Sequence, residues 1–453
     1  EEEVVNGAAR IRTRSQQAQE DTALFYLLLA TGARPLEVAR LEVRDYLNED
    51  GTVRRTSSLR AEFAINGRSR PLFFTCRRKL TTDTGISGIG EIYTATYSPH
   101  LVAKMAEEVA ARHVIGADPF HIEHMWRNVY GRGYAHRPDL TTGGIVSGLE
   151  MAMWDICGKE TGKPVYELLG GRVHEKLRAY TYLYPPVGVD VYADDPVYSD
   201  PDAAAECAVR EVERGFTGVK FDPAGRYSVY DGRQPALHAM DLSEKMVRAV
   251  REAIGDRADI LFGTHGQFTA SGAIRLAKKL EKYDPLWFEE PCPPDSPDEI
   301  AKVARATSIP ISAGERLTTK YEFHQLLKTG AASILQPNLG RCGGLLEGKK
   351  IASMAEVYHA QIAPHLYCGP VVAAANIQLA TCTPNFLILE TIQGWQGFHS
   401  ELVKTSIKFE NGFIIPPTEP GLGIELNETV ALANPYSGSE LHLEMSSVPA
   451  TLL

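Results

Sequence analysis

The stretches PLWFEEP (residues 285–291) and IPISAGE (residues 309–315) carry the pattern from which the fold of this chain can be predicted. Each is a short apolar run that ends in a glutamate, Glu289 in the first and Glu315 in the second. Five further apolar runs end in polar residues in the same way: VKFDP at Asp222, ILFGTH at Gly263–His265, SILQPN at Asn338, QIAPH at His365 and FLILE at Glu390. Most of these ends are roughly 25 residues apart, which is the length of a strand, a turn and a returning helix.

This repeat predicts a parallel β/α barrel, whose first strand we expect at Leu177–Leu183. The carboxyl ends of the strands converge on one mouth of such a barrel, and barrel enzymes place their chemistry there. Two carboxylates at that mouth, together with histidines from other strands, predict a metal-assisted acid/base site.

Composition and charge are those of an ordinary globular protein. The 453 residues predict two or three domains, and a net charge of −10 argues against nucleic acid as a partner. No apolar run approaches the length of a membrane span. The seven cysteines are scattered without a CxxC pair, which indicates reduced thiols. We therefore expect a cytoplasmic homo-oligomer that acts on a small molecule and has no nucleic-acid or membrane partner.

Residues 1–75 differ in pattern from the rest of the chain. LLLATGARPLEVARLEVRDY (residues 27–46), followed by GRSRPLFF (residues 67–74), resembles the opening of a tyrosine recombinase catalytic domain. In that family the arginine after Thr-Gly, here Arg34, contacts the scissile phosphate. The later His-x-x-Arg box and tyrosine nucleophile of the family have no counterpart in this sequence. We interpret residues 1–75 as a recombinase-like remnant or fused segment without recombinase chemistry.

A second resemblance covers residues 78 to about 445. Six motifs carry it in order: TTDTGISGIGE (residues 81–91), SGLEMAMWDICGKETGKPVYELLGG (147–171), WFEEP, AGE, Gly343-Gly344 and PHLYCGP (364–370). Together they resemble the mandelate racemase/muconate lactonizing branch of the enolase superfamily. The resemblance implies an α/β fold in which an α+β capping domain, residues 76–175 with about 400–453, covers a (β/α)7β TIM-like barrel at residues 176–400. It also implies a bound Mg²⁺, with Mn²⁺ as an alternative, and removal of a proton α to a carboxylate.

The expected metal ligands depart from the family at one position. Relatives place ligands at the ends of the third, fourth and fifth barrel strands, and Glu289 and Glu315 match the last two. Gly263 stands where relatives carry the first, an aspartate. Asp222, at the end of the neighbouring second strand, is the expected substitute. His265 is the alternative, and an imidazole ligand would favour a softer metal ion than Mg²⁺.

Three residues match proton-transfer positions of the family. His265 matches the acid that protonates the leaving β-oxygen, and His365 matches the base. Asn338 replaces the aspartate that usually partners this base, so we expect His365 to be a weaker base. Lys220 aligns with the first lysine of the Lys-x-Lys racemase motif. Near a cation its pKa would be depressed, and it could act as base or acid, or bind a carboxylate.

The remaining expected site residues are substrate-binding ones: Asn338, Glu390, Tyr93, Tyr97 and His100. Taken together, the residues predict a Mg²⁺-dependent acid-sugar dehydratase or cycloisomerase, which removes the α-proton and expels a β-oxygen through an enediolate. Two alternatives remain open at this point. One is a racemase or epimerase of a hydroxy acid. The other is a catalytically impaired fusion protein, because Gly263 breaks the ligand set and residues 1–75 replace the expected start of the capping domain.

Overall fold

The computed structural model describes residues 56–59, 70–73, 79–93, 98–131, 139–184, 196–225, 227–392, 394–395 and 397–434. The chain divides into two compact units, Glu1–Arg78 and Lys79–Leu453. In the first unit the described residues form one antiparallel pair, β1 (Thr56–Leu59) with β2 (Arg70–Phe73). The recombinase-like stretch with Arg34 lies outside the described residues.

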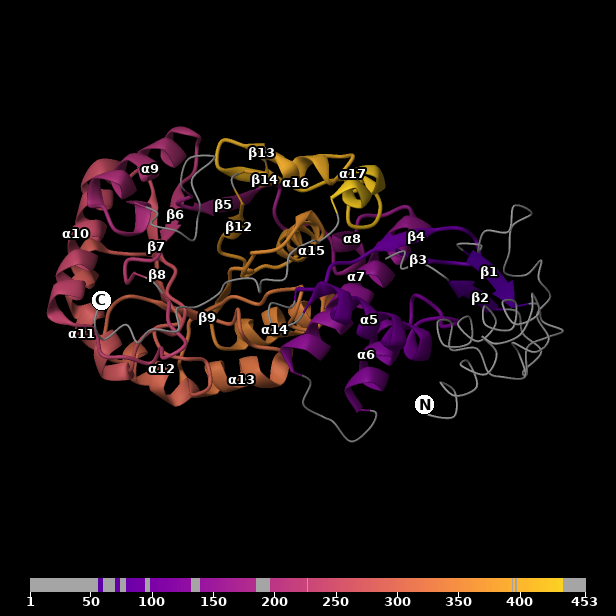
Figure 1. Cartoon of the computed structure of the whole chain (residues 1–453), viewed down its shortest axis with the longest axis horizontal. Coiled ribbons are helices and arrows are strands. Elements are labelled where there is room, and N and C mark those ends of the chain that lie inside the picture. The colour runs from indigo at the N-terminus through magenta and orange to yellow at the C-terminus, as the bar shows by residue number, and fades with distance from the viewer. Residues whose placement is uncertain are drawn as a thin grey trace, which may run out of the picture. The chain divides into compact units, whose positions relative to one another are not determined.

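The described part of the second unit contains the predicted barrel, whose eight strands are parallel (Figure 1). They are β5 (Leu177–Tyr182), β6 (Gly218–Phe221), β7 (Asp259–Phe262), β8 (Trp287–Glu289), β9 (Ile311–Ala313), β10 (Ile334–Leu335), β11 (Gln361–Ile362) and β12 (Leu389–Thr391). Neighbours in sequence pair in parallel from β5 to β11. The ring closes because β12 pairs with β5, while a parallel bridge joins Ile362 to Phe386 just ahead of β12.

A helix follows each of the first seven strands, as the (β/α)7β prediction requires. These helices are α9 (Pro201–Glu213), α10 (Leu237–Ile254), α11 (Ala270–Leu280), α12 (Pro297–Ala304), α13 (Thr319–Thr329), α14 (Leu345–Val357) and α15 (Pro370–Thr381), with short 3-10 turns η2 (Pro196–Tyr198) and η3 (Glu281–Tyr283). Side-chain N-caps mark the start of two of these helices: the Asp200 side chain caps α9, and the Thr269 side chain caps α11. Figure 1 shows α9 to α12 on the outside of the strands. Within the described residues no helix is both long and apolar enough to cross a membrane.

Side-chain alternation along the strands decides what enters the barrel. One layer of the interior is apolar and fully or almost fully buried, and it consists of Tyr180, Leu261, Trp287, Ile334, Ala363 and Ile388. Because successive strand residues point to opposite faces, the residue two positions further along also points inward. Tyr182, Lys220 and Glu289 therefore enter the barrel at or next to this layer, where each strand ends. The alternation thus separates a packed apolar floor from a polar mouth.

The capping part is built around one long helix. Its elements are β3 (Lys79–Thr81), β4 (Ser87–Ile89), α5 (Pro99–His113), α6 (Ile122–Gly131), α7 (Leu140–Thr161), α8 (Val165–Leu168), α16 (Phe398–Glu401) and α17 (Glu428–Ala433). A hairpin of β13 (Lys408–Glu410) and β14 (Phe413–Ile415) adds to the start of β5. The residues of α7 are buried almost throughout. Glycines make this possible: a Cβ on Gly90 of the β3–β4 segment would lie 1.7 Å from the carbonyl oxygen of Gly148 in α7.

Buried carboxylates attach α7 to its surroundings. Glu150 accepts hydrogen bonds from the backbone N–H groups of Leu345 and Leu346, both at 2.8 Å, at the start of the barrel helix α14. It also accepts one from the Trp154 indole at 2.7 Å, and burial raises its pKa to about 7 against these donors. Asp155 accepts from the backbone of Ile89 and Leu422 at 3.1 and 2.9 Å. The helix thereby holds a barrel helix, the β3–β4 hairpin and the C-terminal segment together.

We predict that Glu150→Gln destabilises the second unit, because the amide would turn an NH₂ group toward one of the three N–H donors. A buried donor left without an acceptor costs about 1–3 kcal/mol, so the free energy of unfolding should fall by about the same amount. Urea unfolding followed by circular dichroism measures the change. Glu160→Gln, at an exposed position of the same helix, is the matched control. Equal stability of the two variants would show that Glu150 does not hold the domains together.

Candidate active site

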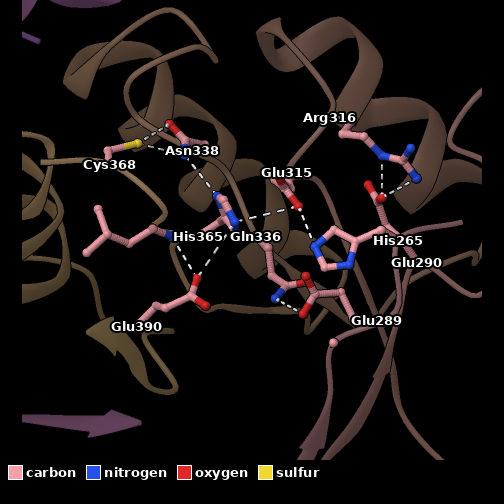
Figure 2. Close-up of polar contacts among 12 residues, drawn as sticks. His265, Glu289, Glu290, Glu315, Arg316, Gln336, Asn338, His365, Cys368 and Glu390 are labelled. Atoms are coloured by element: carbon pink, nitrogen blue, oxygen red, sulfur yellow. Dashed lines mark hydrogen bonds and ion pairs between the residues drawn. The ribbon is translucent and has the colours of Figure 1, made fainter. Parts of the chain in front are cut away.

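The polar residues at the strand ends converge at the mouth of the barrel, as the sequence predicted (Figure 2). Each comes from a different strand or from the residues directly after it: Lys220 from β6, His265 from β7, Glu289 from β8, Glu315 from β9, Asn338 from β10, His365 from β11 and Glu390 from β12. All of these except the half-buried His265 are buried. Burying an ionisable group costs free energy unless the group is paired, and these residues pair with one another.

Three of these residues could hold a metal ion. His265, Glu289 and Glu315 each offer one ligand atom, and these atoms all lie within 4.8 Å of one another. Oε2 of Glu315 accepts no hydrogen bond from the described residues, and it lies 3.4 Å from Nε2 of His265 and 3.5 Å from Nε2 of His365. Burial alone would raise the pKa of Glu315, but His365 and His265 outweigh it and hold the pKa well below its usual value. A buried oxygen without a hydrogen bond, beside a second carboxylate and an imidazole, fits a divalent cation.

Asp222, the expected third ligand, lies outside this group. Its Oδ1 accepts a hydrogen bond from the backbone N–H of Ala224 at 2.7 Å, as in a turn after a strand. Burial raises the pKa of Asp222 to about 7, and the hydrogen bonds from Ala224 and Tyr227 oppose that rise. The structure therefore gathers His265, the alternative ligand, with the two glutamates.

Steric crowding explains why residue 263 is a glycine. A Cβ placed there would lie 2.2 Å from the Tyr182 hydroxyl oxygen and 2.7 Å from Cε of Lys220. The Tyr182 hydroxyl also donates a hydrogen bond to the Gly263 carbonyl at 3.0 Å. Tyr182 and the stem of Lys220 thus fill the space that an aspartate on the third strand would need. The sequence analysis missed Tyr182, although alternation from Tyr180 along the same strand would have pointed it inward.

Lys220 is fully buried between two carboxylates. Its Nζ lies 2.8 Å from Oε2 and 3.0 Å from Oε1 of Glu289, and 3.2 Å from Oε1 of Glu390. Burial lowers the pKa of Lys220, but Glu289 and Glu390 outweigh burial and raise it above its usual value. In this arrangement the lysine is a charged ammonium. The depressed pKa was expected for a lysine beside a bound cation and stays a prediction.

The orientation of Asn338 determines which nitrogen of His365 carries the proton. Oδ1 of Asn338 accepts a hydrogen bond from the backbone N–H of Gly340 at 2.8 Å, so its NH₂ group faces Nδ1 of His365, also at 2.8 Å. An amide NH₂ can only donate, so Nδ1 accepts and the neutral imidazole carries its proton on Nε2. An aspartate at position 338 would favour the opposite tautomer. Burial lowers the pKa of His365, and Glu315 and Glu390 oppose this.

Neighbouring polar side chains position the glutamates. Gln336, which the sequence analysis did not single out, donates to Oε2 of Glu289 at 2.9 Å. Glu290, the residue after Glu289, pairs with Arg316 at 2.7 Å. Oε2 of Glu390 accepts from the backbone of Leu366 at 2.6 Å and lies 4.0 Å from Nε2 of His365.

Of the two expected substrate-binding residues of the cap that the structure describes, Tyr93 reaches the site and His100 does not. The Tyr93 ring is buried and stacks on His365 with 6.3 Å between ring centroids. His100 is exposed in the first turn of α5, and Tyr97 lies outside the described residues.

Comparisons with known proteins place this geometry in a family context. Residues 63–170 match the mandelate racemase/muconate lactonizing enzyme N-terminal domain, and residues 202–430 match the enolase C-terminal domain-like family. D-xylonate dehydratase of Haloferax volcanii is 33% identical over 367 residues, which cover 80% of this chain and 86% of that protein. D-galactonate dehydratase of Ralstonia pickettii is 33% identical, with 78% and 89% covered. The structure of a mandelate racemase/muconate lactonizing enzyme from Sulfitobacter is similar with a TM-score of 0.79 and 54% identity, covering 82% of this chain and 92% of that one.

We predict that His265→Asn weakens divalent-cation binding by at least about tenfold, since it removes one of the three gathered ligands. Asp222→Asn should weaken binding less, because its carboxylate accepts a backbone hydrogen bond outside the group. Isothermal titration of metal-free protein with Mg²⁺ and with Mn²⁺ measures both. A greater loss in Asp222→Asn than in His265→Asn would restore Asp222 as the third ligand.

Proposed function

Because the chain belongs to the mandelate racemase/muconate lactonizing enzyme branch of the enolase superfamily, we propose that it is a divalent-cation-dependent sugar-acid dehydratase. The observation that carries the proposal is the buried cluster of Lys220, His265, Glu289, Glu315 and His365 at the mouth of the barrel. It combines a cation site, a fixed positive charge and a proton-transfer imidazole. Relatives named D-xylonate and D-galactonate dehydratase support the same reaction class.

We assign the cation to Glu289, Glu315 and His265, with Mg²⁺ as the expected ion and Mn²⁺ as the alternative. When bound, the ion would stabilise negative charge on the oxygens of an enediolate. The second role considered for His265, protonation of the leaving oxygen, would use the same Nε2 atom that faces Glu315. The two roles therefore compete for one atom, and the calorimetric comparison of His265→Asn with Asp222→Asn bears on which one it has.

Lys220 would supply a permanent positive charge to the same enediolate. Its ammonium is fixed between Glu289 and Glu390, so it needs no reorganisation when negative charge develops on the substrate. Removing a proton next to a carboxylate creates an additional negative charge, and a preorganised cation is the most effective way to stabilise it.

His365 is the group that we assign to proton transfer at the α-carbon. The α C–H bond breaks as its electrons form the enediolate, and the proton goes to Nε2 of the His365 tautomer that carries its own proton on Nδ1. Asn338 disfavours that tautomer, so His365 would be a weak base. The bond from the β-carbon to oxygen then breaks, and the hydroxyl leaves as water with a proton from the His365 imidazolium, or from His265 in the acid role considered for it. The product is a 2-keto-3-deoxy acid after tautomerisation. If the leaving oxygen belongs to a ring ether, the same steps give a cycloisomerase. A racemase or epimerase would instead return the proton to the α-carbon.

One screen tests this function. The purified chain with Mg²⁺ or Mn²⁺ is incubated with a library of sugar acids and their lactones in deuterated water. Formation of a 2-keto acid is followed chemically, and deuterium incorporation is followed by nuclear magnetic resonance. A 2-keto acid confirms elimination, whereas deuterium in unchanged or epimerised acid would support the racemase alternative.

We predict that Asn338→Asp raises the rate of α-proton exchange by roughly tenfold or more. An aspartate accepts the N–H of Gly340 and also a proton on Nδ1 of His365, which frees Nε2 to act as a base. Deuterium exchange into the substrate measures the rate, and His365→Asn should abolish the gain. A slower Asn338→Asp variant would show that His365 acts as an N–H donor and not as the proton acceptor.

A further inference from the structure

Arg341 is a buried cation without a carboxylate partner. It follows β10 in the loop that carries Asn338, and only 4% of its surface is exposed. Its Nε atom donates no hydrogen bond in the described part of the chain, and no ion pair of Arg341 occurs there. The second arginine at this mouth, Arg316, donates a hydrogen bond from Nε to Oε2 of Glu290 at 2.7 Å, and its Nη2 forms an ion pair with the same oxygen, also at 2.7 Å. A buried guanidinium usually has such a partner, because an unpaired buried charge is costly.

The surroundings of Arg341 direct it toward the reaction site. Its guanidinium carbon lies 3.7 Å from the centre of the Tyr93 ring, which in turn stacks on His365. The two separations, 3.7 and 6.3 Å, together place Arg341 within about 10 Å of the His365 ring. The charge of Arg341 also acts on a site residue. Burial raises the pKa of Glu315, and Arg341 is one of the groups that lower it, after His365 and His265. The guanidinium thus lies against Tyr93, near the proton-transfer imidazole, and its charge reaches the cation ligand Glu315.

The site thus offers two kinds of positive charge to a substrate. The carboxylate next to the reacting carbon belongs with the cation ligands and Lys220, because charge develops there. Arg341 and Tyr93 are then left for another part of the substrate, beyond the reacting carbon. A planar guanidinium with free N–H groups recognises carboxylate and phosphate oxygens, which can each accept two hydrogen bonds from it.

We propose that Arg341, stacked on Tyr93, forms an anion subsite, and that the natural substrate is a sugar acid with a second anionic group at its far end. This inference rests on the proposed function and specifies its substrate class. The anion is a carboxylate, as in a sugar diacid, or a phosphate ester. The named relatives act on D-xylonate and D-galactonate, which have one carboxylate, so the subsite would separate this chain from them.

The test compares substrates that differ only at the far end. D-Galactonate, galactarate and D-galactonate 6-phosphate present a hydroxyl, a carboxylate and a phosphate, and the same triplet is made for other configurations of the sugar chain. We expect a dianionic member to exceed the matching monoacid by roughly 10- to 100-fold in kcat/KM, the range of a charge-assisted hydrogen bond. Whether the carboxylate or the phosphate member is preferred identifies the source of the anion.

Variants separate recognition from folding. Arg341→Gln should reduce the dianion-to-monoanion ratio of kcat/KM roughly 10- to 100-fold, mainly through KM, and Arg341→Lys should restore part of it. Arg316→Gln removes a charge at the same mouth that already has a partner, and should leave that ratio unchanged. Melting temperatures report whether each variant folds. A monoacid preference in the unmodified chain, or a ratio that Arg341→Gln does not change, would overturn the proposal.

A second readout keeps the two proposals distinguishable. If no sugar acid of any charge loses water, the proposed dehydratase function fails, and equilibrium binding still decides the subsite. Calorimetry of galactarate against D-galactonate should then show tighter binding of the diacid to the unmodified chain, and loss of that difference in Arg341→Gln. Equal binding of the two acids by the unmodified chain would exclude the anion subsite.

Discussion

The fold of the second unit depends on polar hydrogen bonds made by a helix that is buried almost completely. Helix α7 packs between the capping hairpin, the C-terminal segment and the barrel, so the carboxylates of Glu150 and Asp155 are removed from water. Buried carboxylates are costly unless they are hydrogen-bonded, and the starts of helices offer N–H groups without intrahelical acceptors. Glu150 satisfies two such groups of α14. Glu91, just after β4, accepts from Gly369, the residue before α15, and from Val372 in its first turn.

These contacts connect the cap with the site. Helices α14 and α15 follow the strands that carry Asn338 and His365, so the cap glutamates hold the elements on both sides of the proton-transfer pair. The same attachment brings Tyr93 onto His365 and under Arg341. Tyr93 thus reaches the barrel mouth because Glu91, two residues earlier in the chain, is hydrogen-bonded to the start of α15.

Mutual pairing explains why the mouth can hold so many ionisable groups. Lys220 forms ion pairs with Glu289 and Glu390, two histidines flank Glu315, and Arg316 pairs with Glu290. Two departures from the family pattern follow the same logic. Gly263 makes room for the Tyr182 hydroxyl and the Lys220 stem, and Asn338 replaces a charge next to His365 by a neutral amide. Both remove a negative charge from the site, and Arg341 then remains as a cation for which the described residues provide no carboxylate.

The sequence by itself determined the barrel, because strands that end in polar residues and recur at the spacing of a strand, a turn and a helix are typical of a closed parallel β/α barrel. It also determined that Glu289, Glu315, His365 and Glu390 meet, since the carboxyl ends of parallel strands share one mouth. Only the tertiary structure decided that His265 and not Asp222 lies with the glutamates, that α7 is buried on all sides, and that Tyr182 occupies the place of a side chain at position 263. The physical reason is that spacing along the chain specifies which end of a strand a residue occupies. The direction of its side chain, its hydrogen-bond partners and the unpaired state of Arg341 depend on contacts between segments far apart in sequence.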